Sequence, residues 1–311
     1  MEQTVIVEEV RSHLSDEKVK KAIELQSYIR GYLGGFFRTK GFIEVPPVII
    51  SPVTDPLNHP VHDPHIDYYG TQYALTKSMI FHKQILVKEL GSIFTFSPNV
   101  RLETPDKAET GRHLSEFTQI DVEKVGATRE EMMDLVEDLY IGLLKDLTGG
   151  KVEPFNFFER KLVVPEKPFK RIKYKEAESE YGNDFESILS SRMKEPFWII
   201  DIPLEKREFY DREYEDLHGI LRDMDLIYPE GFGEALSGGE REFKIDRIIK
   251  RIHDKNQTEE QFKWFIEYAK RGLEPSAGFG IGIERLTRFI SGLKRIEDTH
   301  PFPKIPGKVS L

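Results

Sequence analysis

Glycine recurs at every second position from Gly278 to Gly282, and the residues that follow, 284–290, have the pattern of a helix. Because side chains alternate between the two faces of a strand, residues 277–283 are predicted to form a strand with one bare face. A flat ligand can lie against the backbone of such a strand. The spacing matches neither the GxGxxG motif of dinucleotide-binding folds nor a P-loop, which excludes both of these parallel-sheet nucleotide sites.

Strand-like segments are frequent in the rest of the chain. The run EFTQIDVEKV (116–125) alternates polar and apolar residues, and FWIIDI (197–202) has the composition of a buried strand. Short strand-like runs separated by turns fill residues 73–115. Strands therefore outnumber those of a parallel βαβ series, so the sequence predicts an α+β fold with a largely antiparallel sheet flanked by helices.

Helices are predicted at 15–40, 128–147 and 258–272. Ser15 is the predicted N-cap of the first, and Thr258 with Gln261 forms a capping box at the start of the last. No repeat, low-complexity tract or flexible linker divides the chain. A single α+β domain over residues 1–311 is therefore expected.

Composition narrows the functional classes. The 311 residues include 45 Lys+Arg against 54 Asp+Glu, and the formal net charge of −9 argues against a protein that coats nucleic acid. The absence of cysteine excludes disulfides, thiolate metal sites and a cysteine nucleophile. The chain begins without a signal pattern and has no apolar run long enough to cross a bilayer, so a cytoplasmic protein without a membrane partner is expected.

Two strand segments carry charged residues that share a face. Arg101 and Glu103 are two positions apart and can bind a phosphate and an amine side by side, although a cross-strand ion pair on a solvated sheet gives the same pattern. The second segment has same-parity residues at Phe117, Gln119, Asp121 and Glu123. An aromatic ring followed by polar groups suits an adenine platform beside an amine-binding carboxylate, and the alternative is a sheet with one wet face.

A third segment, residues 228–242, combines glycines with charged residues. Glu234 and Ser237 offer hard oxygen ligands of the kind that bind Mg²⁺ together with phosphates. Arg241 can clamp a carboxylate, and a mobile polar hairpin is the alternative interpretation. Arg285 starts the helix beside the glycine-rich strand and completes the candidate set.

The segment 51–70 is crowded with Pro, Asp and His, which predicts an irregular loop. Its composition is that of a zinc cluster, with possible ligands at Asp55, His59, His62, Asp63 and His65. The proline-dense spacing is unlike a closed structural zinc site, so an active-site lid is favoured, with His59 and His65 as its candidate residues.

In this order, the segments resemble the catalytic domain of class II aminoacyl-tRNA synthetases, in particular the aspartyl and asparaginyl branch. The residues that carry the resemblance are GFIEV at 41–45, VRLE at 100–103, RHLSEFTQIDVE at 112–123 and GFGIGIERL at 278–286. The resemblance spans residues 17–304. It implies an antiparallel sheet flanked by helices, a homodimer, and activation of an amino acid by ATP with Mg²⁺.

The resemblance also implies a role for individual residues. Arg101 would hold the α-phosphate of ATP and Arg285 its γ-phosphate, which makes both catalytic. The other implied ATP ligands are Glu103 for the adenine amino group, Phe117 for stacking, His113 near the outer phosphates, and Glu234, which with Ser237 would bind Mg²⁺. The implied aspartate-binding residues are Ser78, Lys83, Asp121 and Arg241.

The expected reaction depends on what precedes the first helix. Aspartyl and asparaginyl enzymes place an anticodon-binding barrel there, and a helix that begins near residue 15 leaves no room for one, so no tRNA partner is expected. Ammonia would then accept the activated β-aspartyl group. The chain is expected to be an aspartate–ammonia ligase (AMP-forming), similar to archaeal-type asparagine synthetases. The alternatives are a truncated synthetase that acts on tRNA or a protein acceptor, and a non-catalytic amino-acid sensor.

Overall fold

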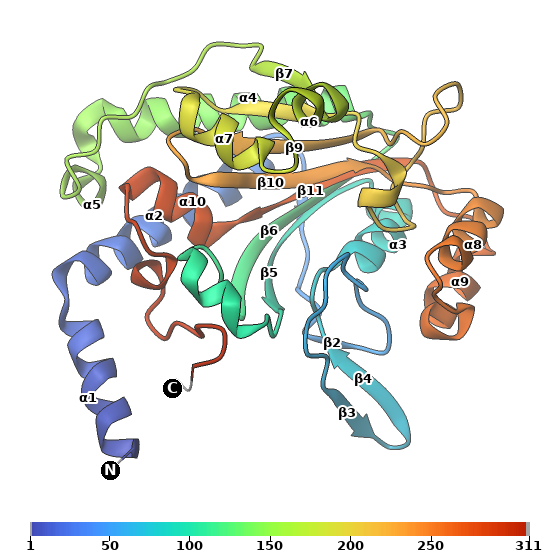
Figure 1. The fold of residues 1–311 in the computed structure, drawn as a ribbon, viewed down its shortest axis with the longest axis horizontal. Coiled ribbons are helices and arrows are strands. Elements are labelled where there is room, and N and C mark those ends of the chain that lie inside the picture. The colour runs from blue at the N-terminus through green and yellow to red at the C-terminus, as the bar shows by residue number, and fades with distance from the viewer. Residues whose placement is uncertain (1, 309–311) are drawn as a thin grey trace.

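An eight-stranded sheet forms the centre of the molecule in the computed structural model, which describes residues 2–308 (Figure 1). The strands, in spatial order, are β1 (Ile43–Glu44), β5 (Ser92–Val100), β6 (Glu116–Val125), β11 (Ser276–Gly282), β10 (Gly233–Glu240), β9 (Asp223–Tyr228), β8 (Phe197–Ile200) and β7 (Lys170–Lys173). The inner pairs are antiparallel, whereas β1–β5 and β7–β8 at the two edges are parallel. The predicted α+β fold is confirmed, with a mixed sheet in which antiparallel pairs predominate.

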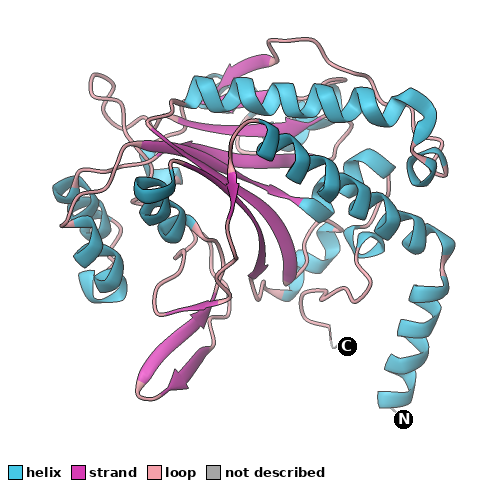
Figure 2. Ribbon diagram, turned by 180° about the vertical axis from the view of Figure 1, so that it is seen from behind, coloured by secondary structure: helices cyan, strands magenta, loops and turns pink. Residues whose placement is uncertain are grey.

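Helices cover one face of this sheet. Figure 2 shows the long helices α2 (Glu17–Thr39) and α4 (Arg129–Asp146) crossing that face, and α10 (Ile283–Ser291) packs beside α2. The main core lies between these helices and the apolar side chains of the central strands, for example Ile120 and Val122 of β6. Alternate residues of β6 therefore point to the opposite face, which is left open for a site.

The remaining helices lie outside this layer, and two of them cover the opposite face of the sheet near β8 and β9. The helices outside the layer are α1 (Glu2–Ser15), α3 (Ile80–Leu90), α5 (Glu153–Asn156), α6 (Tyr174–Tyr181), α7 (Phe185–Arg192), α8 (Ile245–Asp254) and α9 (Lys263–Ala269). A second core, with Phe81, Phe209 and Phe265 at its centre, joins α3 to α8 and α9. Among residues 2–308, no helix combines the length and the apolar character that a membrane span requires.

The predicted start of the first long helix is wrong. Asp16 is the N-cap of α2, since its backbone is extended and its carboxylate accepts a hydrogen bond of 2.8 Å from the amide of Lys18. Ser15 instead ends a separate helix, α1, and its hydroxyl donates to the carbonyl of Ser12. The predicted capping box at Thr258 is present, and it opens a 3-10 turn that leads into α9. A capping box that was not predicted, at Thr128, opens α4.

Two further expectations are corrected between residues 51 and 91. Residues 80–90 form helix α3 rather than strand-like runs, because Ile80, Gln84 and Val87 recur at helical spacing and are buried. Residues 65–70 are not an irregular loop: β3 (His65–Tyr68) pairs with β4 (Thr71–Leu75), and β4 pairs with β2 (Ile50–Ser51). Tyr69 and Gly70 both have positive φ, as a two-residue hairpin turn requires.

The expected bare face of β11 is present only in part: Gly280 and Gly282 line a cavity on this side of the sheet, whereas Gly278 does not. A Cβ on Gly278 would lie 2.0 Å from Oε2 of Glu123 and 2.2 Å from the carbonyl oxygen of Val122. A Cβ on Gly280 would lie 3.1 Å from Oδ1 of Asp121. The carboxylate of Glu123 therefore fills the space beside Gly278, and glycine is required there for β11 to lie this close to β6.

The close approach makes Gly278→Ala strongly destabilising. The new methyl group would overlap both a carboxylate and a backbone carbonyl, which cannot move without breaking the β6–β11 ladder, so the free energy of unfolding should fall by about 3 kcal/mol. Gly282→Ala is the matched control, because the nearest atoms are side-chain carbons of Arg285 at 3.7 Å and its φ is −68°. Chemical denaturation of the two variants measures the difference, and equal stabilities would contradict the packing argument.

Candidate active site

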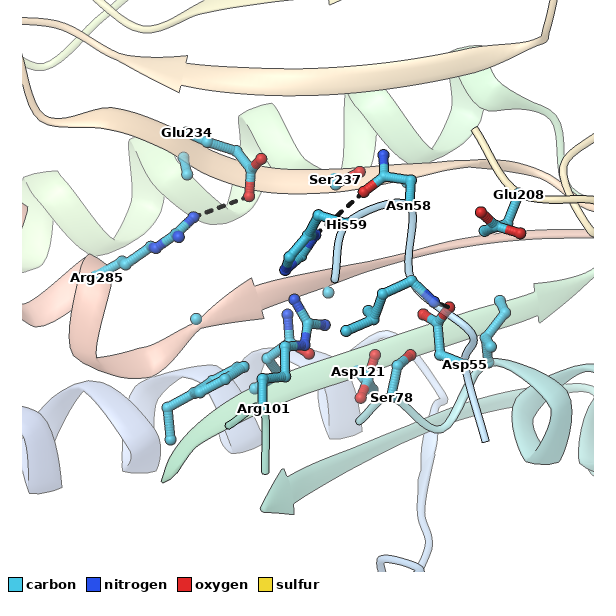
Figure 3. A pocket seen from close by; sticks show the side chains of 18 of the residues that line it. Asp55, Asn58, His59, Ser78, Arg101, Asp121, Glu208, Glu234, Ser237 and Arg285 are labelled. Atoms are coloured by element: carbon cyan, nitrogen blue, oxygen red, sulfur yellow. Dashed lines mark hydrogen bonds and ion pairs between the residues drawn. The ribbon is translucent and has the colours of Figure 1, made fainter. Parts of the chain in front are cut away.

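A polar cavity of about 340 Å³ opens on the face of the sheet that the long helices leave free. Its walls come from β6, β10, β11, the loops around residues 55–59 and 101–114, and the starts of α3, α7 and α10. Figure 3 shows Arg285 and Glu234 at one end, Arg101 in the middle, and Asp121 with Ser78 beyond it. The cavity therefore brings residues from distant parts of the chain into a single row.

Strand β6 supplies the floor. Phe117, Gln119 and Asp121 line the cavity, and Glu123 continues the same face with no exposed surface. The parity of the sequence predicts this row, since the intervening residues Ile120 and Val122 pack into the core.

Arg101 lies beside the aromatic ring of the floor. Its guanidinium carbon is 5.3 Å from the ring centroid of Phe117, and its Nε donates to the carbonyl oxygen of Lys77 at 3.1 Å. Glu103 lines the cavity close by, with Oε1 at 3.1 Å from Nε2 of His59. Burial opposes ionisation of Glu103, but the hydrogen bond from His59 and the charges of His59, His113 and Arg101 lower its pKa overall.

Cationic groups gather at the end of the cavity that holds Arg285 and Glu234, which we call the outer end. Arg285 donates to Oε1 of Glu234 at 2.9 Å, whereas Arg112 has its NH1 3.8 Å from Oε1 of Glu186 (Figure 3 shows the first of these pairs). Burial, with the charges of Arg285 and Arg112, lowers the pKa of His113 to about 4, so its imidazole is neutral at pH 7. An end with arginines and a neutral imidazole suits a polyanion such as a phosphate chain.

Glu234 and Ser237 reach the same cavity because β10 contains a β-bulge. Glu234 pairs with Ile227 and Leu236 with Leu226, so one residue of β10 has no partner in β9. The bulge reverses the alternation, which would otherwise place residues 234 and 237 on opposite faces. These two hard oxygen donors fit Mg²⁺ when phosphate oxygens supply the remaining ligands.

No cluster of three or more His, Cys, Asp or Glu side chains suited to a metal ion occurs within the described part of the chain, residues 2–308. The histidines of the 51–70 segment, which lies wholly within the described residues, therefore form no such cluster. His59 lies in the cavity, whereas His65 is exposed on β3 and does not line it.

The opposite end of the cavity, beyond Asp121, is the inner end. It holds a row of buried charges of alternating sign. Arg241 links Asp211, at 3.0 Å from NH1, to Glu123, at 3.1 Å from Nε. Lys83 lies 3.8 Å from Glu123 and donates to Oδ1 of Asp121 at 2.8 Å. We call Asp211, Arg241, Glu123, Lys83 and Asp121 the charge ladder. Its last member keeps Oδ2 buried and without a hydrogen-bond partner among the described residues, so this atom is available to a donor on a ligand.

Several residues of the inner end were missed in the sequence. Arg207 lies 3.2 Å from Asp223 and donates to Asp225, and burial raises the pKa of both carboxyls. Glu186 at the outer end was also missed, and burial, with Glu234 and Asp225 nearby, raises its pKa to about 7. The shared parity of Asp223 and Asp225 on one strand was the available signal. Glu186 lies on a short helix in a segment with no distinctive motif.

Comparison with known proteins places the chain in a family. Residues 3–306 match the family model described as tRNA synthetases class II (D, K and N). An asparagine–tRNA ligase of Koribacter versatilis (strain Ellin345) is 31% identical over 291 residues, which cover 86% of this chain and 65% of that protein. One from Lactococcus lactis subsp. cremoris (strain SK11) is 29% identical over 316 residues, covering 94% of this chain and 68% of the relative. The chain thus spans about two thirds of the length of these relatives.

Solved structures share the fold. Asparaginyl-tRNA synthetase from Pyrococcus horikoshii, complexed with asparaginyl-adenylate, superposes with a TM-score of 0.88 at 23% identity, covering 98% of this chain and 73% of that one. The Entamoeba histolytica asparaginyl-tRNA synthetase in complex with asparaginyl-adenylate gives 0.84 at 22% identity, covering 95% and 69%. The class II synthetase-like architecture expected from the motifs is confirmed.

The expected aspartate–ammonia ligase activity is wrong by these comparisons. The relatives are named for ligation of asparagine to tRNA, and the solved structures are asparaginyl-tRNA synthetases. That expectation rested on the helix predicted to begin near residue 15, which would leave no room for an anticodon-binding barrel before it. The sequence of the catalytic domain alone does not determine which acceptor receives the activated amino acid.

Proposed function

Because the chain belongs to the family of class II tRNA synthetases (D, K and N), we propose that it activates asparagine with ATP and transfers the asparaginyl group to tRNA. One observation supports this most directly: a single cavity joins the Phe117–Arg101 pair to an arginine-rich outer end and to the unpartnered carboxylate oxygen of Asp121. These are the groups that an adenine, a phosphate chain and an α-ammonium group require.

The order of these groups suits formation of an aminoacyl-adenylate. Adenine would stack on Phe117 beside Glu103, and the outer phosphates would lie against Arg285. The α-phosphate would then lie near Arg101, between the phosphate end and the amino-acid end. Attack by the α-carboxylate forms the new phosphorus–oxygen bond as pyrophosphate leaves, and the fixed guanidinium groups stabilise the negative charge that builds in the transition state. Mg²⁺ held by Glu234 and Ser237 would neutralise charge on the phosphates.

The charge ladder favours a neutral side chain on the amino acid. Lys83 and Arg241 were expected to bind the carboxylate of aspartate, but both already have buried carboxylate partners. A further carboxylate would add a fourth negative charge beside these two cations, which already have Asp121, Glu123 and Asp211 as partners. An amide, which both donates and accepts hydrogen bonds, fits a wall of mixed charge without an added net charge. Aspartate remains the second candidate, because two cations line the same wall.

The segment 55–59 is proposed to act as a lid. Asp55 accepts a hydrogen bond of 3.1 Å from the hydroxyl of Tyr210, and Asn58 donates to the carbonyl oxygen of Lys206 at 3.0 Å. His59 reaches Glu103, the carboxylate proposed to bind the adenine amino group. These contacts hold the segment across the cavity, where it can exclude the water that would hydrolyse an adenylate.

A homodimer is proposed from the exposed apolar residues on β1 and on the segment that leads from β1 to β2. Ile43, Ile49 and Ile50 are 48%, 56% and 45% exposed, and they follow one another along a short segment. A concentrated apolar surface next to a sheet edge is typical of a protein–protein interface. A second copy of the chain would cover it.

ATP–pyrophosphate exchange across all twenty amino acids tests the proposed function. Exchange with asparagine, followed by charging of tRNA with labelled asparagine, is the expected result. Exchange with aspartate alone would select the second candidate. Formation of free asparagine from aspartate and ammonium without tRNA would contradict both the proposed substrate and the proposed acceptor.

Arg101→Ala should lower the rate of adenylate formation at least about 100-fold, because the variant loses the cation nearest the proposed α-phosphate position. Its thermal stability should stay close to that of the wild type, since Arg101 donates to a backbone carbonyl and is only partly buried. Arg11→Ala, on the exposed surface of α1, is the control. Full exchange activity in Arg101→Ala would contradict the assignment.

His59→Ala should shorten the lifetime of the bound adenylate roughly fivefold, because the lid loses one of its hydrogen bonds across the cavity. The measurement is release of AMP in the absence of an acceptor. His65→Ala serves as the matched control, since this histidine lies on the exposed strand β3. If both variants release AMP at the wild-type rate, the 55–59 segment is not a lid.

Replacing Ile43 and Ile49 together by lysine should convert the dimer into a monomer, because two charges would enter an apolar interface without partners. Sedimentation velocity measures the outcome. Trp264→Lys is the control, since this residue is 57% exposed on α9, far along the chain from the β1 edge. A wild-type protein that is already monomeric would contradict the proposal.

A further inference from the structure

Strand β6 extends beyond the end of its neighbour. The pairing of β11 with β6 runs from Ser276, opposite Val125, to Gly282, opposite Gln119. There β11 turns into helix α10, whose first residue is Ile283. The backbone of β6 continues to Glu116, so the amide of Thr118 lies past the last carbonyl that β11 supplies.

Glu284 takes the place of the missing carbonyl. Both of its carboxylate oxygens lie 3.1 Å from the amide nitrogen of Thr118. The residue is only 2% exposed, although it lines the cavity. Burial raises the pKa of Glu284 to about 7, and in either protonation state a side-chain oxygen can accept from the amide. The contact extends the β6–β11 ladder by one step.

The contact joins two parts of the proposed ATP site. Thr118 directly follows Phe117, the ring proposed to stack on adenine, and Glu284 directly precedes Arg285, the cation proposed to bind the γ-phosphate. Arg285 is itself held by Glu234 at 2.9 Å. The hydrogen bond between Thr118 and Glu284 therefore joins the adenine platform directly to the phosphate clamp, one step beyond the β6–β11 ladder.

We propose that Glu284 is a positioning residue for nucleotide binding, which fixes the separation between Phe117 and Arg285 so that one ATP molecule contacts both. The inference rests on the proposed function, because it assumes that the cavity binds ATP. A purely structural role is the competing explanation, since any buried carboxylate that loses its hydrogen bond destabilises the fold.

The test compares Glu284→Ala with Glu284→Gln. The alanine variant should raise the KM for ATP, and the dissociation constant of ATP measured by calorimetry, by about tenfold, while the KM for the amino acid stays unchanged. The glutamine variant should restore wild-type values, because its amide oxygen can accept from Thr118. If Glu284→Ala does not fold, Glu284→Asp, which is one methylene too short, should show the same selective loss of ATP affinity.

Glu137→Ala is the matched control for a structural effect. Glu137 is also 2% exposed and accepts from Nε1 of Trp198 at 2.9 Å, on the helix-covered side of the sheet. It should lower the thermal stability without changing the affinity for ATP. Unchanged ATP affinity in the alanine or aspartate variant, or an equal loss in Glu137→Ala, would overturn the inference. Absence of amino-acid activation in the wild type, with ATP still bound, would instead count against the proposed function.

Discussion

The charge ladder at the inner end of the cavity is the interaction on which the rest of the site depends. Burying a charge without a partner costs several kcal/mol, so Asp121 and Glu123 can occupy the floor only because Lys83 and Arg241 lie between and beside them. The ladder needs room above β6, which the glycines of β11 supply. The glycine pattern in the sequence therefore has a direct structural purpose, because these glycines leave the space in which the carboxylates of β6 form their ion pairs.

The two ends of the cavity differ in how far their charges are already satisfied. At the inner end, guanidinium and ammonium groups are neutralised within the protein, which leaves one carboxylate oxygen of Asp121 for a ligand. At the outer end, Arg112 has a carboxylate no closer than 3.8 Å, and burial together with the charges of Arg285 and Arg112 lowers the pKa of His113 and keeps it neutral at pH 7. Such an arrangement attracts a polyanion at one end and an ammonium group at the other. It thereby sets the orientation of a substrate pair before any contact is made.

The features that could be predicted from the sequence are those that depend on a regular alternation of residues or on the order of the motifs. The parity of 117–123 placed four side chains on one face, and the order of the motifs identified the sheet architecture. The sequence could not reveal the β-bulge in β10, because an extra residue in a strand leaves no compositional trace, yet the bulge alone brings Glu234 and Ser237 together. Arg207 and Glu186 were missed for a related reason: their partners lie on other elements, and only the tertiary structure pairs them.

The 55–59 segment connects the inner end of the cavity to the place where adenine is proposed to bind. Its contact through Asp55 and Tyr210 lies at the inner end, and its contact through His59 and Glu103 lies where adenine is proposed to bind. Oε2 of Glu103 is buried and has no hydrogen-bond partner among the described residues, so the adenine amino group can donate to this oxygen while His59 keeps its contact with Oε1. An amino acid beside Asp121 would likewise leave the contact between Asp55 and Tyr210 in place. The segment would then stay anchored at both places over a bound adenylate, which is the state in which water has to be excluded.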